Sequence, residues 1–315
     1  MKLWTHDAFR EHKFPKPIWV VRPLFQRGST NLLQGEPESG KTAFAMTLAE
    51  AVASGEPLFG EFVTVQRGTV VIIELDMGAQ QYRHRWPNAL FARTEDLPLY
   101  HITTDNPINI AGTHKYKPLQ EAADLDPTLV IVDALIDTHD LDENKAETVK
   151  RVLGGFRSYF PRACRVFIHH NAKESSVVAR SPMSRVRGHG GWAGSASTVL
   201  EFTRKLKAPE WTTTMTFTKG RDTPDWMKRP RKLALDVATM TLHFAEPTME
   251  QRARAHALKA KGKMEPGELV GFLQGCDDGL SRSAAYRLAQ DVLEAIQNDD
   301  NLNQDKHLRL IDSRK

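Results

Sequence analysis

The chain has 315 residues, of which 40% are hydrophobic and 26% are charged. This composition is ordinary for a globular protein and excludes a disordered chain. The formal net charge of +4 permits an anionic partner without requiring one. No run reaches the roughly 20 apolar residues of a membrane helix, and the 2 cysteines are too few for a disulfide framework. We therefore expect a cytoplasmic protein with no membrane partner.

The first part of the chain predicts an α/β fold. Residues 1–26 have scattered apolar and proline positions without a period, and they predict an extended segment that lies against the core. Farther along, short β-rich runs alternate with helical stretches, which predicts a mostly parallel sheet covered by helices. These runs and stretches lie in turn at 30–33, 41–53, 69–74, 78–92, 129–132, 144–159 and 165–168.

The pattern changes after residue 197. Strand-like runs at 198–202, 212–218, 233–237 and 241–244 follow one another with only loops between them, so we expect antiparallel additions at the sheet edge. The main domain would then span 27–246. A basic, alanine-rich stretch at 247–263 predicts a helical linker. Residues 264–315 predict a small helix-turn-helix-like unit, with Ser281 positioned to cap its second helix.

The strongest motif is GEPESGKT, which fits G-x-x-x-x-G-K-[ST] and lies between a strand-like run and an amphipathic helix. In this pattern the backbone N–H groups of the loop hold the β-phosphate of a nucleotide. The lysine reaches the β- and γ-phosphate oxygens, and the hydroxyl that follows binds Mg²⁺. The predicted nucleotide-binding residues are Gly35, Glu36, Pro37, Glu38, Ser39, Gly40, Lys41 and Thr42.

A second ligand for the metal is predicted at the end of LVIVDA. Four apolar residues of buried-strand length precede Asp133, which places its carboxylate at the carboxyl end of a strand. Together with the Thr42 hydroxyl, this carboxylate would hold Mg²⁺ beside the phosphates. We therefore expect ATP and Mg²⁺ as cofactors.

The order of these elements resembles the RecA-like ATPases, in particular the hexameric helicase branch with plasmid RepA-type and DnaB-type replicative motors and their phage relatives. The resemblance covers roughly residues 15–245 and implies a RecA-like P-loop core. In that branch a carboxylate after the second strand polarises the attacking water, with an arginine nine residues later. Asp76 and Arg85 have that spacing. The family has Glu at this position, and Glu74 lies on the same strand face, so either carboxylate could be the base.

The strand run RVFIHH resembles the next strand of the family, whose last residue senses the γ-phosphate. His170 would be this sensor. Adjacent histidines also suggest a metal site, but His169 and His170 point to opposite faces of a strand and make a poor chelating pair.

Two later segments extend the resemblance. Residues 171–197 resemble the channel loop that grips single-stranded DNA, and the ending of TFTKGR resembles a K-x-R pair that crosses the subunit boundary to the γ-phosphate next door. The pair would be Lys219 and Arg221. The predicted DNA contacts are Lys173, Arg180, Arg185 and Arg187.

The resemblance implies an oligomeric ATPase, with a hexameric ring, that acts on single-stranded DNA in the replication or recombination of a phage or plasmid. One alternative is a RecA-like ATPase that loads or regulates replication proteins without unwinding. Another is a small-molecule P-loop kinase. The cross-subunit pair and the channel loop favour the motor, because a monomeric kinase would need neither.

Overall fold

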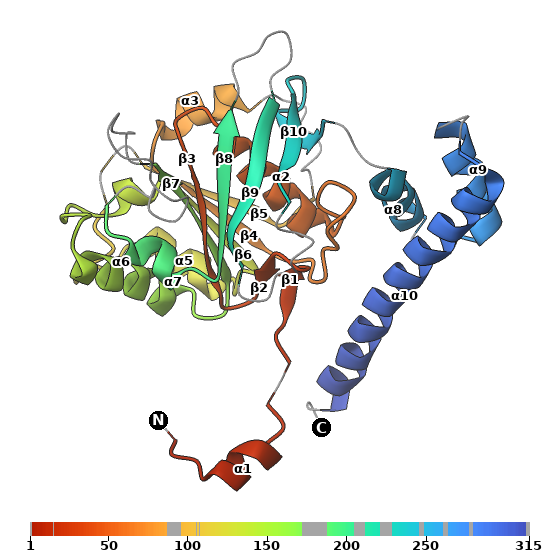
Figure 1. The fold of residues 1–315 in the computed structure, drawn as a ribbon. Helices are drawn as coiled ribbons and strands as arrows, with labels where there is room; N and C mark the ends of the chain where they lie inside the picture. The colour runs from red at the N-terminus through yellow and green to blue at the C-terminus, as the bar shows by residue number, and fades with distance from the viewer. Residues whose placement is uncertain are drawn as a thin grey trace, which may run out of the picture.

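The computed structural model of the chain describes residues 2–14, 16–86, 96–104, 106, 108–171, 188–204, 212–220, 229–245, 249–260, 264–276 and 280–312. Within these residues the main domain contains one nine-stranded sheet with the strand order β11-β10-β9-β8-β3-β7-β6-β4-β5, drawn in Figure 1. The predicted α/β class is confirmed, because helices cover both faces of a largely parallel sheet.

The strands from β8 to β5 in this order run parallel to one another. The central strands are buried apolar runs, as expected where helices cover both faces of a sheet. The edge strand β5 is partly exposed, which explains why its sequence did not predict a strand. The bounds are β3 (Thr30–Gly35), β4 (Val70–Glu74), β5 (Leu99–Thr103), β6 (Leu129–Asp133), β7 (Cys164–His170) and β8 (Thr198–Arg204).

Alternate side chains of these strands enter two hydrophobic cores. On one face, Phe44 and Leu48 of helix α2 (Lys41–Ser54) pack with the strands. On the other face, Phe156 of helix α6 (Ala146–Tyr159) packs in a second core. Helices α5 (Lys117–Asp124) and α7 (Gly191–Ser195) and the 3-10 turn η1 (Leu135–Thr138) lie on this second side, whereas α3 (Gly78–Arg85) follows β4.

The expectation of antiparallel additions holds for three strands and is wrong for β8. Strands β9 (Thr212–Gly220), β10 (Arg231–Asp236) and β11 (Thr241–Phe244) pair antiparallel, but β8 pairs parallel with β3. The chain between β7 and β8 includes helix α7, so it makes a crossover that returns the strand in the same direction. The sheet therefore becomes antiparallel only from the β8–β9 pair outward.

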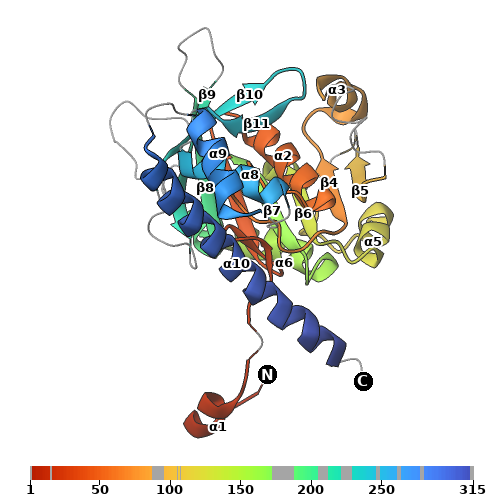
Figure 2. The ribbon, with the colours of Figure 1, turned by 90° about the vertical axis from the view of Figure 1, so that its right-hand side faces the viewer.

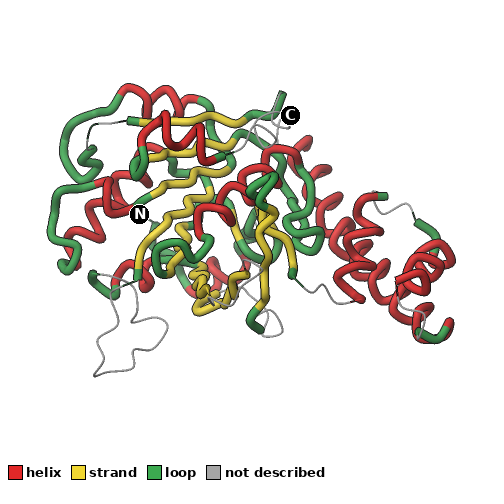
Figure 3. The backbone as a smooth tube through the Cα atoms, turned by 90° about the horizontal axis from the view of Figure 1, so that it is seen from above, coloured by secondary structure: helices red, strands yellow, loops and turns green. Residues whose placement is uncertain are grey.

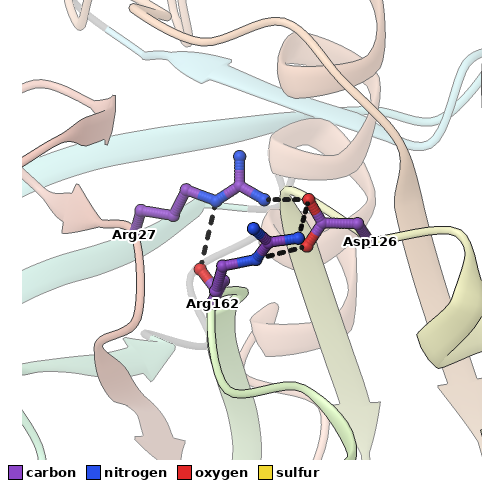
Figure 4. Close-up of polar contacts among 3 residues, drawn as sticks. All are labelled: Arg27, Asp126 and Arg162. Atoms are coloured by element: carbon purple, nitrogen blue, oxygen red, sulfur yellow. Dashed lines mark hydrogen bonds and ion pairs between the residues drawn. The ribbon is translucent and has the colours of Figure 1, made fainter. Parts of the chain in front are cut away.

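At the amino ends of three neighbouring strands, one carboxylate binds two guanidinium groups (Figure 4). Asp126 accepts hydrogen bonds from Arg27 Nη2 at 3.1 Å and from Arg162 Nε at 3.1 Å. Arg27 Nε also donates to the carbonyl oxygen of Arg162 at 3.2 Å. Because these residues precede β3, β6 and β7, the cluster ties the three strands together at the end of the sheet opposite the phosphate loop.

The N-terminal segment differs in part from the expected extended segment. It contains a short helix, α1 (His6–Glu11), none of whose residues is buried, and Figure 1 shows this helix standing away from the sheet. The segment then forms a small antiparallel pair, β1 (Trp19–Val21) and β2 (Phe25–Gln26). Only this second part lies against the core, through buried Val20, Val21 and Phe25.

The C-terminal region is a cluster of three helices, α8 (Met249–Lys259), α9 (Pro266–Cys276) and α10 (Arg282–Asp312). Figures 2 and 3 show it beside the sheet domain. The helical part of the expected linker contributes Ala253 and Ala257 to the same hydrophobic cluster as the two later helices. The linker helix is thus also a packed part of this unit. Among the described residues, no helix is long and apolar enough to cross a membrane.

Candidate nucleotide-binding site

The predicted phosphate loop follows β3 at the carboxyl edge of the parallel strands and ends at the start of α2. Gly35 has no room for a side chain, because a Cβ would lie 2.4 Å from the carbonyl oxygen of Phe202 and 2.6 Å from Ser39 Oγ. Gly40, the residue before α2, has a φ of 96°, which favours glycine. The two fixed glycines of the motif therefore shape a loop whose N–H groups precede a helix start, where an anion is favoured.

Lys41 is buried inside this loop. Its ammonium donates hydrogen bonds to the carbonyl oxygens of Gly35 at 3.0 Å and Glu36 at 2.6 Å, and to Ser39 Oγ at 3.4 Å. Burial lowers the pKa of Lys41 to about 8, although the carboxylate of Asp133 opposes this shift. The side chain is therefore held in place by the loop before any phosphate binds.

Thr42 and Asp133 meet as the motif predicts. The Thr42 hydroxyl donates to Asp133 Oδ2 at 2.7 Å across 91 residues of sequence. Burial raises the pKa of Asp133 to about 6, and the hydrogen bond from Thr42 lowers it in part. A hydroxyl and a carboxylate are hard oxygen ligands of the kind that Mg²⁺ prefers. The donor set fits the expected ion.

Glu74 is placed next to Asp133, because the two residues are register partners at the ends of β4 and β6. Glu74 is fully buried, and its Oε1 accepts hydrogen bonds from the backbone N–H groups of Asp76 at 2.8 Å and Met77 at 3.0 Å. Burial and the nearby Asp133 charge raise the pKa of Glu74 to about 7. The carboxylate thus fixes the turn after β4 and interacts electrostatically with Asp133, the candidate metal ligand.

Asp76, the other candidate base, lies two residues farther on and is exposed. Its charge opposes the lowering of the pKa of Lys41 and raises the pKa of Asp133. Both effects place its carboxylate near the residues that would hold the phosphates and the metal. The two carboxylates therefore have different environments: one is buried against backbone amides, and the other is open to water.

Of the remaining predicted site residues, two are described in the structure and five are not. His170 ends β7 and is the register partner of Gly35, so it lies beside the start of the phosphate loop. Lys219, near the end of β9, donates its ammonium to the carbonyl oxygens of Ala193 at 2.9 Å and Gly194 at 2.7 Å, both in α7. The other predicted residues lie outside the described residues: Arg221, Lys173, Arg180, Arg185 and Arg187.

Two supporting contacts were not predicted. Thr213 of β9 donates its hydroxyl to the carbonyl oxygen of Ser39 at 2.7 Å, and Arg204 at the end of β8 binds Glu38 of the loop at 3.3 Å. The partners of these two contacts are 174 and 166 residues apart in the sequence. Local spacing carries no signal for such pairs, so they could be found only from the sheet topology.

A phosphate loop between a strand and a helix, with carboxylates at the ends of neighbouring parallel strands, is the arrangement of a P-loop nucleoside triphosphatase. The amino-acid sequence shows to which family the chain belongs. The family model AAA_25, described as an AAA domain, matches residues 1–176, and the chain belongs to this family. A search of curated proteins gives no match.

Two solved structures are similar in fold. "ATPase Domain of G40P" has 13% sequence identity and a TM-score of 0.51, and the match covers 70% of this chain and 85% of that chain. "The Structure Of A DnaB-Like Replicative Helicase And Its Interactions With Primase" has 13% identity and a TM-score of 0.54, over 70% of this chain and 60% of that one. At this identity the likeness is one of fold. It confirms the RecA-like architecture that the sequence resembled.

Proposed function

We propose that this chain is an ATP-hydrolysing motor of the replicative-helicase type that acts on single-stranded DNA. The observation that best supports the ATPase is the contact of the Thr42 hydroxyl with the Asp133 carboxylate, 2.7 Å apart, beside the buried ammonium of Lys41. These two oxygen ligands would hold Mg²⁺, which when bound neutralises charge on the phosphates. The loop N–H groups and Lys41 would bind the β- and γ-phosphate oxygens.

In this proposal Asp76 polarises the attacking water and Glu74 orders the turn that carries it. Asp76 is exposed and close enough to Lys41 and Asp133 to influence their pKa values. Glu74 Oε1 is already occupied by two backbone amides. Glu74 remains the alternative base, because its pKa of about 7 is suited to accepting a proton near neutral pH.

The assembly part of the proposal is a homo-oligomer, with a hexameric ring, in which Arg221 reaches the nucleotide of the neighbouring subunit and stabilises transition-state charge. His170, beside the phosphate loop, would sense the γ-phosphate. The DNA contacts would come from the loop after β7, with Lys173, Arg180, Arg185 and Arg187. Work in phage or plasmid replication or recombination belongs to the same proposal.

The test is ATP turnover of the full chain with and without oligo-dT. We expect single-stranded DNA to raise turnover, and Lys41→Ala to abolish it while the fold stays intact, because that ammonium acts on phosphate. Replacing Arg180 and Arg185 by Ala should weaken oligo-dT binding with little change in basal turnover. Each lost phosphate contact should reduce the slope of log affinity against log salt by about 0.7.

Two outcomes would contradict parts of this proposal. Near-normal turnover of Lys41→Ala would exclude the phosphate loop as the ATPase site. If ATP turnover required Lys41 but did not respond to oligo-dT, the chain would instead be an ATPase that loads or regulates replication proteins, and the basic loop would contact protein. A monomer with concentration-independent turnover of a small substrate would indicate a kinase.

A further inference from the structure

The three C-terminal helices form one packed unit, in which α9 and α10 follow each other closely along the chain. Five residues separate the end of α9 at Cys276 from the start of α10 at Arg282, and the two helices pack through one hydrophobic cluster with α8. The His256 ring of α8 stacks on Phe272 of α9, with ring centroids 3.9 Å apart. Because the three helices share their own hydrophobic core, their exposed side chains are held in a fixed arrangement. The buried side chains of the later helices are Leu269, Val270, Leu273, Ala285, Ala289, Val292, Leu293 and Ile296.

The beginning of α10 is well defined. Ser281 Oγ accepts a hydrogen bond from the backbone N–H of Ala284 at 3.3 Å, as an N-cap does. The inward face of the first turns carries Ala285 and Ala289, which are fully buried in the hydrophobic cluster shared with α8 and α9. The opposite face of these turns of α10 is therefore exposed to solvent.

That outward face carries residues that can pair with DNA. They are exposed at intervals of one, three and four positions along the helix, so they share one side. Arginine can bind guanine with two hydrogen bonds, and glutamine can do so with adenine. Serine and tyrosine hydroxyls can donate to phosphate. The face consists of Arg282, Ser283, Tyr286, Arg287 and Gln290.

The charge of this face suits a polyanion. Residues 280–290 contain two arginines and no acidic residue, and the exposed acids of the helix begin at Asp291 and Glu294. Tyr286 is 45% exposed, so its ring and hydroxyl are open to a partner on this face. Basic, amide and aromatic groups thus occupy the first part of α10, and its first acidic residue is Asp291, directly after Gln290.

We propose that this face of α10, from Arg282 to Gln290, binds the major groove of duplex DNA. A helix with its side chains is about 10–12 Å across, which matches a groove about 12 Å wide. The second helix of a helix-turn-helix unit enters the groove with its first turns, and here those turns carry the basic face. This site is separate from the predicted single-strand loop of the ATPase domain, and it needs no nucleotide.

The test measures binding of the full chain to a labelled 30-bp duplex of mixed sequence, without nucleotide, at several salt concentrations, where about 30 bp exceeds the length that one unit covers. The double variant Arg282→Ala/Arg287→Ala should lose at least about tenfold in duplex affinity. Its slope of log affinity against log salt should fall by about 0.9 for each lost phosphate contact. Oligo-dT-stimulated ATP turnover should not change.

The matched control is Lys150→Ala/Arg157→Ala, which removes two exposed positive charges from α6 and should change duplex affinity by less than about twofold. Circular dichroism and the melting temperature check that both variants fold. The proposal is overturned if the α10 variant binds the duplex as wild type does, if both double variants lose affinity equally, or if wild type does not bind the duplex at all. In each of these cases the face of α10 is a protein contact or a solvated surface.

Discussion

At the scale of single residues, the two candidate carboxylates at the end of β4 and just after it have different environments. Glu74 is buried and accepts two amide hydrogen bonds, whereas Asp76 is exposed. A general base needs access to the water that it polarises, and the exposure of Asp76 is the reason we propose it for that role. Glu74 instead determines where Asp76 stands, because it binds the backbone N–H of that residue.

This division predicts different consequences for the two neutral variants. Asp76→Asn should still bind ATP but hydrolyse it at least about 10²-fold more slowly, the usual scale for loss of a general base. Glu74→Gln keeps an oxygen that accepts both amide hydrogen bonds, so its turnover should stay within about tenfold of wild type. Single-turnover hydrolysis and nucleotide binding measure both steps. If Glu74→Gln lost turnover and Asp76→Asn did not, the two roles would be exchanged.

The raised pKa of Glu74 predicts a pH dependence of stability. Its pKa moves from 4.5 to about 7 on folding, so between these values the folded chain retains a proton that the unfolded chain releases. The free energy of unfolding therefore falls as pH rises through this window, by at most about 1.4 kcal/mol for each unit of pKa difference. Asp133, whose pKa is also raised, acts in the same direction at lower pH.

Glu74→Gln isolates this contribution, because the amide does not titrate. Urea denaturation of the nucleotide-free chain from about pH 5 to pH 8 should show wild type losing stability relative to the variant as the pH rises. The difference should be present below about pH 5 and largely gone above about pH 7. Parallel stability curves for the two proteins would contradict a raised pKa at Glu74.

At the scale of elements, helix α7 is held at both ends of its short length. Trp192 is buried between His139 and His169, whose ring centroids lie 6.0 and 5.8 Å from its own. Lys219 binds the carbonyl oxygens of Ala193 and Gly194, where a cation satisfies groups that the helix leaves open. The helix that follows the predicted DNA loop is therefore tied to the strand that leads to Arg221.

This anchoring predicts that Lys219 acts within its own subunit, whereas in the proposed motor Arg221 acts across the subunit boundary. Mixing inactive Lys41→Ala with inactive Arg221→Ala subunits should restore some turnover, because an intact nucleotide site then faces an intact arginine. Mixing Lys41→Ala with Lys219→Met should not restore turnover, because the loose α7 stays with the intact phosphate loop. We expect Lys219→Met to cost about 1–3 kcal/mol of stability. Equal recovery in both mixtures would show that Lys219 also acts across the boundary.

At the scale of the whole molecule, one buried carboxylate joins the ATPase domain to the C-terminal helices. Glu61 pairs with Arg231 at 3.3 Å, with both side chains about 10% exposed, and accepts a hydrogen bond from Gln251 at 3.0 Å. Arg254 donates to the Glu61 carbonyl oxygen at 3.0 Å. Ala255 packs against Gly60, where a Cβ would lie only 2.7 Å from its methyl group.

Removing this carboxylate should therefore destabilise more than one element. Glu61→Ala leaves the Arg231 guanidinium buried without its carboxylate, which costs about 3–5 kcal/mol, whereas Glu56→Ala, an exposed acid in the same loop, should cost less than about 0.5 kcal/mol. Chemical denaturation measures both, and hydrogen exchange should show faster opening of α8. A loss below about 1 kcal/mol for Glu61→Ala would mean that the pair does not secure the helices.

Whether a feature could be predicted from the sequence depends on how far apart in the chain the residues that form it lie. The alternation of strands and helices predicted the parallel sheet, and the spacing in GEPESGKT predicted the loop in which Lys41 and Thr42 lie. Such signals reside within a few consecutive residues. The parallel direction of β8, the contact of Thr213 with Ser39, and the pairing of Glu61 with Arg231 depend on where distant segments meet.

Helix α2 connects two functionally different parts of the molecule. It begins at the phosphate loop and ends at Ser54, and after Gly55 the chain leads into the turn that contains Glu61. At about 1.5 Å per residue, its 14 residues form a rigid rod of about 21 Å. One end of this rod lies where a nucleotide would bind, and the other leads into the surface on which α8 rests. The candidate nucleotide site and the support of the C-terminal helices therefore lie at opposite ends of a single helix.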